Sequence, residues 1–169
     1  MEATTREGGE TSSLNASSDD QGTTRTILAA YAVALSVAPM LRRVRSPQLP
    51  RFAGPVGLSL EGVGLALRAW SMRTLEAAYS RTLRTEGEQP VIDTGPYRLV
   101  RHPGYAGSLL TWTGFALTSG SLPVVAAVSV LLARAYQRRI SAEEQLLCRE
   151  LSAYLAYSDR TKKLVPFVW

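Results

Sequence analysis

The sequence contains a single cysteine, Cys148, and a single histidine, His102. One cysteine excludes an intramolecular disulfide, and one residue of each type excludes a zinc site made of histidines and cysteines, so no metal is expected. Because no second histidine is available to activate Cys148, we expect a packed small residue and not a nucleophile. The sequence also has no glycine-rich nucleophile turn, no phosphate-binding P-loop and no Gly-x-Gly-x-x-Gly motif.

Charge and polarity are unevenly distributed along the chain. Residues 1–25 carry five acids and two bases and have almost no large apolar side chains. They also lack the basic and apolar segments of a signal peptide, so we expect a disordered tail. The remaining residues carry 17 bases and 9 acids, and much of this positive charge lies beside apolar runs. This pattern favours membrane lipids as partners and not a nucleic acid.

The apolar residues gather in a few long runs without a visible polar face, which is typical of membrane helices. The turn signal at 119–123 divides the longest run into a helical hairpin. We therefore predict an all-α membrane bundle, with 26–169 as one domain. Its four transmembrane helices are expected near residues 26–41, 52–70, 104–118 and 123–137.

The segments between these runs are expected to be polar. Pro39 should kink or stop the first helix. Residues 71–103 are expected to form a polar loop with short ordered pieces, and a separate polar helix is expected near 140–157. The first connector has four Lys and Arg residues, against five in the 71–103 loop and seven in the tail from Arg134. The loop, the tail and both termini are therefore expected on the cytoplasmic side.

The second run has two features of its own. Glu61 and Arg68 lie seven residues apart and so fall on nearly the same helix face. For Glu61 we consider a place in a substrate path, whereas for Arg68 we favour extension to the membrane interface beside Trp70. Glycines permit close approach of a neighbouring helix, and this run has four of them: Gly54, Gly57, Gly62 and Gly64.

Two polar segments are candidates for a site. The stretch 95–105, GPYRLVRHPGY, places two aromatic residues, two arginines and the histidine beside an apolar hairpin. The residue before a proline avoids the helical region, so His102 should lie at an element boundary. Beyond the hairpin, Arg139 and Glu143 are helix-surface neighbours, with Glu144 beside them. The alternatives are a loop that anchors the membrane interface and an ordinary salt-bridged helix face.

GPYRLVRHPGYAG, followed by the hairpin and by RRISAEE, resembles the isoprenylcysteine carboxyl methyltransferase family over residues 79–169. The resemblance implies an S-adenosylmethionine-dependent enzyme with a cytoplasmic donor pocket, formed by the 79–105 loop and the C-terminal helix. It implies a lipophilic or prenylated acceptor, and it places Arg139 near the acceptor carboxylate as a catalytic residue together with Glu143. The implied donor-binding residues are Gln89, Pro90, Val91, Ile92, Tyr97, His102, Pro103, Gly104, Tyr105, Glu143 and Glu144.

Other functions remain open at this point. The acceptor could be a lipid amine or a small thiol instead of a carboxylic acid. Some nicotinamide-dependent membrane reductases share the Arg-His-Pro-x-Tyr core, but their pattern has Asn in place of Gly104 and a Glu soon after Tyr105. A non-catalytic membrane ligand-binding protein is the third class.

Overall fold

The structure is a computed structural model, and it describes residues 23–41, 48–82 and 91–165. These residues form α-helices and one short 3-10 helix, so the all-α prediction is confirmed for this part of the chain. Among the helices of these three ranges, none has both the length and the apolar character needed to cross a membrane. The elements are α2 (Thr23–Leu41), α3 (Ala53–Thr82), η1 (Gly95–Arg98), α4 (Pro103–Thr118), α5 (Leu122–Glu150) and α6 (Tyr154–Arg160).

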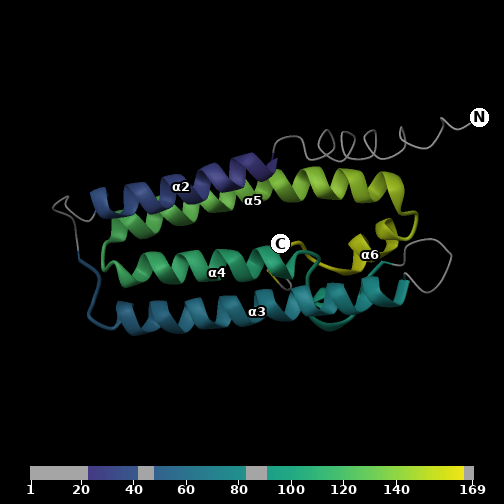
Figure 1. Ribbon diagram of the computed structural model, residues 1–169, viewed down its shortest axis with the longest axis horizontal. Helices are drawn as coiled ribbons and strands as arrows, with labels where there is room; N and C mark the ends of the chain where they lie inside the picture. The colour runs from purple at the N-terminus through teal and green to yellow at the C-terminus, as the bar shows by residue number, and fades with distance from the viewer. Residues whose placement is uncertain (1–22, 42–47, 83–90, 166–169) are drawn as a thin grey trace, which may run out of the picture.

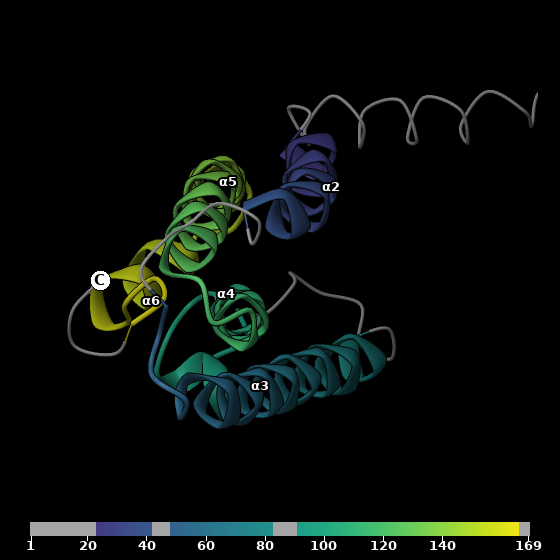
Figure 2. The same cartoon turned by 90° about the vertical axis from the view of Figure 1, so that its left-hand side faces the viewer.

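The four long helices lie side by side in one bent layer, in the order α3, α4, α5 and α2 (Figure 1). Seen end-on, α4 lies between α3 and α5, and α6 lies to one side of them (Figure 2). Neighbouring helices run in opposite directions, so the C-terminal ends of α3 and α5 and the N-terminal end of α4 meet near α6. We call this the α6 end of the bundle.

Helix α3 is longer than the apolar run that predicts it. It begins within one residue of the expected start but continues to Thr82, so the prediction that a polar loop begins at residue 71 is wrong. Residues 71–82 contain neither proline nor glycine and include several good helix formers, so no local signal ends the helix. The added turns carry α3 past the start of α4.

Helix α5 also differs from the prediction. The separate polar helix expected near 140–157 is wrong, because α5 continues without a break from Leu122 to Glu150. The chain breaks at 151–153 instead, where Leu151 is extended, and α6 follows. Pro39 lies two residues before the end of α2, as expected of a proline that stops a helix.

Glycines bring α3 and α4 into close contact. A Cβ atom added at Gly57 would lie 2.6 Å from the carbonyl oxygen of Gly114, and one added at Gly64 would lie 2.5 Å from that of Gly107. The expected close approach is therefore confirmed at Gly57 and Gly64. The other two glycines of the predicted set have open space around their Cβ positions: Gly54 and Gly62.

The buried apolar core lies between α2, α4 and α5. Its largest member, Tyr136 of α5, forms a hydrogen bond through its hydroxyl with Tyr31 of α2. Tyr31 in turn stacks on Trp112 of α4, with ring centroids 4.8 Å apart. Large aromatic surfaces of this kind contribute strongly to packing, and here they join α2, α4 and α5.

Candidate functional site

The 95–105 stretch forms a helical turn, a short extended segment and the start of α4. Gly95 has a positive φ of 58°, which favours glycine, and Pro96 opens the 3-10 turn. His102 is the N-cap residue of α4 with φ −123° and ψ 56°, and Pro103 occupies the first turn. The prediction that His102 lies at an element boundary is confirmed.

The segment after α6 holds this stretch by its backbone. The N–H of Arg101 donates to the carbonyl oxygen of Lys162 at 2.7 Å, and that of His102 donates to Lys163 at 3.0 Å. From α6 itself, the hydroxyl of Tyr157 donates to the carbonyl oxygen of Tyr97 at 2.7 Å. Residues far apart in the sequence therefore fix the position of His102.

Glu144 lies among three cationic or hydrogen-bonding side chains. Its Oε1 accepts from Arg101 Nε at 2.8 Å and lies 3.2 Å from His102 Nε2, and its Oε2 lies 2.9 Å from Lys163 Nζ. Burial alone would raise the pKa of Glu144, but the hydrogen bonds from His102, Lys163 and Arg101 outweigh it and lower the pKa to about 2. An ionised carboxylate only accepts hydrogen bonds, so Glu144 holds a hydrogen on the Nε2 atom of His102.

Glu143, the preceding residue, has a different set of partners. Its Oε1 accepts from the hydroxyl of Tyr105 at 2.5 Å and from Arg139 Nε at 2.7 Å. Arg139 Nε is also 3.2 Å from the Tyr105 hydroxyl, and His102 Nδ1 lies 3.7 Å from Glu143 Oε2. The predicted contact of Arg139 with Glu143 is confirmed. Consecutive residues point about 100° apart on a helix, so His102 lies between two carboxylates that belong to different networks.

A cavity of about 430 Å³ opens beside Glu143 at the α6 end. This volume is within the range of small-molecule sites. Seven of the residues that the sequence assigns to the site line the cavity: Val91, Ile92, Tyr97, His102, Gly104, Tyr105 and Glu143.

The remaining predicted site residues lie elsewhere. Pro103 is buried in the first turn of α4, and Glu144 belongs to the network of Arg101. Arg139 does not line the cavity, but it contacts two residues that do. Gln89 and Pro90 are outside the described residues.

Sequence analysis missed much of the wall. One group comes from α3 at positions i, i+3, i+4 and i+7, a helical spacing that becomes visible once the helix is known to continue past residue 70: Arg68, Ser71, Met72 and Leu75. Leu147, on α5, follows Glu143 by one turn. The others come from three places, which are the 95–105 stretch, the break that follows α5, and helix α6: Arg101, Leu151, Tyr154 and Tyr157.

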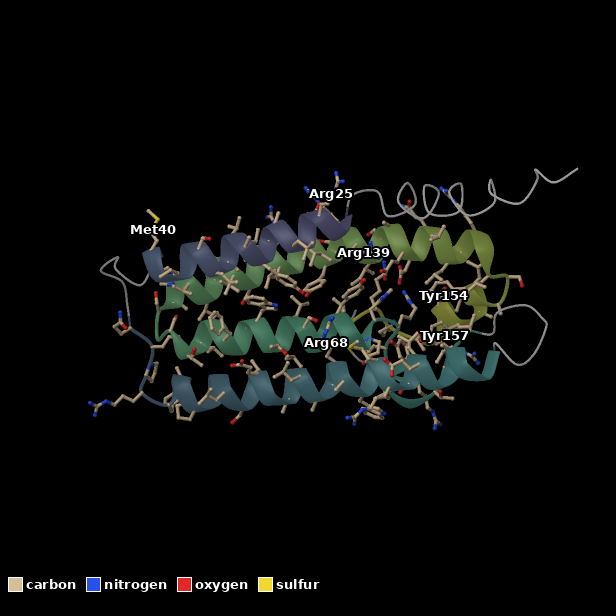
Figure 3. The ribbon with its side chains drawn as sticks, viewed as in Figure 1. Arg25, Met40, Arg68, Arg139, Tyr154 and Tyr157 are labelled. Carbon is tan, nitrogen blue, oxygen red and sulfur yellow. The ribbon has the colours of Figure 1, made fainter. Side chains whose placement is uncertain are left out.

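Arg68 is exposed, as its expected extension toward the membrane interface requires, and that interpretation stays a prediction. Its side chain also contacts α4. Its Nη1 atom donates to the hydroxyl oxygen of Ser108 on α4 at 2.6 Å. Figure 3 shows Tyr154 and Tyr157 at the end of the bundle opposite Met40, with Arg68 and Arg139 nearer its middle. The close contact of α3 with α4 lets Arg68 reach both Ser108 and the cavity.

The tyrosines of the wall are neutral at physiological pH. Burial, followed by the nearby Tyr157 and Glu143, raises the pKa of Tyr97 to about 12. Burial raises the pKa of Tyr154 as well, and among the described residues its buried hydroxyl has no hydrogen-bond partner. The wall thus combines apolar surface and neutral aromatic rings with one carboxylate, that of Glu143, the guanidinium groups of Arg68 and Arg101, and the imidazole of His102. Such a wall suits a ligand that carries both a positive and a negative group.

Comparison with known proteins adds a family to this geometry. The isoprenylcysteine carboxyl methyltransferase (ICMT) family matches residues 58–149, more than half of the chain. A probable protein-S-isoprenylcysteine O-methyltransferase of Oryza sativa subsp. indica is 28% identical over 149 residues, covering 82% of this chain and 76% of that protein. Protein-S-isoprenylcysteine O-methyltransferase A of Arabidopsis thaliana is 29% identical over 115 residues, covering 66% of this chain and 58% of that protein. The cobalt-zinc-cadmium resistance protein CzcN of Cupriavidus metallidurans is 31% identical over 113 residues, covering 67% of this chain and 47% of that protein.

Proposed function

The chain belongs to the isoprenylcysteine carboxyl methyltransferase family and is a methyltransferase, and from this premise we propose that it methylates the carboxylate of a prenylated cysteine with S-adenosylmethionine as donor. The observation that carries the proposal is the cavity at the α6 end. Its wall brings Glu143, His102 and Tyr105 together from two helices of the family-matched region.

The residues of the cavity fit this donor. S-adenosylmethionine carries a sulfonium and an amine, which are cations, together with a carboxylate, a ribose and an adenine ring. The aromatic faces of Tyr97 and Tyr105 can attract the sulfonium, and Glu143 can accept hydrogen bonds from the amine or the ribose. Tyr154, whose buried hydroxyl has no partner among the described residues, adds aromatic surface to the wall. We keep Gln89, Pro90, Val91 and Ile92 as further donor contacts.

The protein's own task is alignment and exclusion of water. When bound, S-adenosylmethionine supplies an electrophilic methyl group on its sulfonium. A carboxylate acceptor is already ionised at neutral pH, so no side chain has to remove a proton from it. Glu143 and Tyr105 hold the donor. Arg139 lies one helical turn from Glu143, and its planar guanidinium can hold the acceptor carboxylate with two hydrogen bonds.

We assign Glu144 a positioning role beside this site. It accepts from His102 on the side away from Glu143, and it also binds Arg101 and Lys163. A partly buried group with this many charged partners fixes geometry more readily than it binds a ligand. Pro103, in the first turn of α4, sets the backbone that presents His102.

We further propose that α2, α3, α4 and the apolar half of α5 lie in a membrane, with the α6 end and both termini at its cytoplasmic face. The basic residues of the 71–103 segment and the tail favour this side. A lipid-tailed acceptor would then reach Arg139 from the apolar part of the bundle, while the donor enters from water.

Binding and turnover test the proposal directly. Protein purified in detergent is titrated with S-adenosylhomocysteine and with a nicotinamide cofactor, and transfer of labelled methyl is followed on a prenylcysteine acid, a lipid amine and a small thiol. We expect binding of the first ligand only and methylation of the acid. Arg139→Lys should lose turnover on the acid, since an ammonium cannot reproduce the planar fork. The matched control is Arg138→Lys, at the exposed neighbouring arginine, and it should keep its turnover. Preferred methylation of the amine or the thiol would replace the proposed acceptor.

A further inference from the structure

Arg68 occupies a fixed position in the contact between α3 and α4. A Cβ atom added at Gly107 would lie 2.8 Å from the backbone nitrogen of Arg68, so the two backbones touch at this point. From there the side chain reaches the cavity wall and donates to Ser108. The hydroxyl of Ser108, which is only 4% exposed as a residue, donates in turn to the carbonyl oxygen of Gly104 at 3.0 Å. The position of the guanidinium is therefore defined by both helices.

The charge of Arg68 is not matched by a carboxylate, unlike the charges of three other basic residues at this end. Arg101 and Lys163 pair with Glu144, and Arg139 pairs with Glu143. Within the ranges that the structure describes, Arg68 forms no ion pair, and its hydrogen bond goes to a neutral hydroxyl. A guanidinium has five N–H donors, so most of its capacity remains for a ligand, and its exposure lets a ligand reach it.

We propose that Arg68 binds a carboxylate at the cavity wall, in addition to the role proposed for Arg139 outside that wall. This inference rests on the proposed function, which supplies two possible carboxylates: that of the donor's methionine part and that of the prenylcysteine acceptor. Arg68 and Glu143 then act as opposite poles of one wall, the first for an anion and the second for a cation. Arg139 already donates from Nε to Glu143 and Tyr105, whereas Arg68 faces the cavity from the other side, on α3.

The test compares each ligand with a form that lacks the carboxylate. Affinities of wild type, Arg68→Ala and Arg68→Lys are measured for S-adenosylmethionine and its decarboxylated form, and for an N-acetyl-S-prenylcysteine and its amide. Loss of a charged hydrogen bond corresponds to about a 10- to 150-fold weaker affinity. Arg73→Ala, an exposed arginine of the same helix outside the cavity wall, is the matched control and should change none of these values.

The pattern of losses identifies the carboxylate. If Arg68 binds the donor, Arg68→Ala weakens S-adenosylmethionine but not its decarboxylated form; if it binds the acceptor, the variant weakens the acid but not the amide. Equal losses with and without the carboxylate, or no loss at all, would overturn the proposal. Arg68→Lys, which keeps the charge, should retain part of the affinity and guards against a folding defect. A wild-type protein that binds no S-adenosylmethionine would refute the proposed donor, while the acid and amide would still test Arg68.

Discussion

Replacement of Gly64 with alanine should separate two helices that are held together by their backbones. The added Cβ atom would lie 2.5 Å from the carbonyl oxygen of Gly107 and 2.5 Å from the backbone nitrogen of Thr111. Both are main-chain atoms of α4, so no side-chain rotation can relieve the overlap. To restore ordinary contact at 3.4 Å, α3 and α4 would have to move apart by about 1 Å.

The expected cost follows from two opposing effects. Overpacking of a close contact costs about 1–3 kcal/mol, whereas alanine in place of glycine inside a helix gains roughly 0.5–1 kcal/mol. Gly64→Ala should therefore destabilise the fold, by about 1 kcal/mol at the middle of these ranges and by at most about 2.5 kcal/mol. Gly62→Ala is the matched control, because its Cβ atom would meet nothing within 4 Å, and it should stabilise the fold by about 0.5–1 kcal/mol.

Circular dichroism of thermal unfolding, with both variants in the same detergent, measures the difference in their stability. Since Arg68 lies one turn beyond Gly64 and contacts α4, Gly64→Ala should also weaken binding of S-adenosylhomocysteine, whereas Gly62→Ala should not. If the two variants unfold at the same temperature, the close contact of α3 with α4 does not stabilise the bundle, and the packing argument is refuted.

Three further predictions concern the site and the membrane. Glu143→Gln should weaken donor binding about 10- to 150-fold in calorimetric titration, because a charged hydrogen bond is lost; unchanged affinity would leave Glu143 a structural residue. Glu144 has a folded-state pKa of about 2, below the ordinary 4.5, so its ionised form stabilises the fold above about pH 4.5 and this contribution is lost as the pH falls toward 2. The unfolding free energies of wild type and Glu144→Gln should therefore converge on acidification, and a constant difference would contradict this. Cysteines placed at Arg51 and Lys162, with Cys148→Ser as background, should be labelled from opposite sides of a membrane; labelling from one side would exclude the proposed topology.

The sequence predicts the apolar helices well because their ends carry local signals. The turn at Ser119–Gly120 and the proline that begins α4 are visible in the sequence, and both boundaries lie within one residue of their predicted positions. The polar turns at the end of α3 and in the middle of α5 carry no such signal. A change from apolar to polar residues resembles the end of a helix when a membrane is assumed, although the backbone hydrogen bonds continue through it.

The site could be predicted in part, because its motif residues are close together in the sequence. The motif assigns Glu143 and Tyr105 to one site, and in the structure the Tyr105 hydroxyl lies 2.5 Å from Glu143 Oε1. Arg68 and the tyrosines of α6 reach the wall only through the packing of helices, which no spacing along the chain reveals. Glu144 differs from Glu143 in its ion pair with Lys163, and the position of Lys163 is likewise set by tertiary contacts.

The continuity of α5 makes its length as important as its sequence. The helix runs from the hairpin turn through both glutamates without a break, and each residue adds 1.5 Å of rise and 100° of rotation. Deletion of one residue between 123 and 138 would place Glu144 where Glu143 now stands, and Gln145 where Glu144 stands. On its Nε2 side His102 would then face an amide in place of a carboxylate, although no side chain of the site had been mutated. This helix should accordingly tolerate substitutions in its apolar half far better than a change of a single residue in its length.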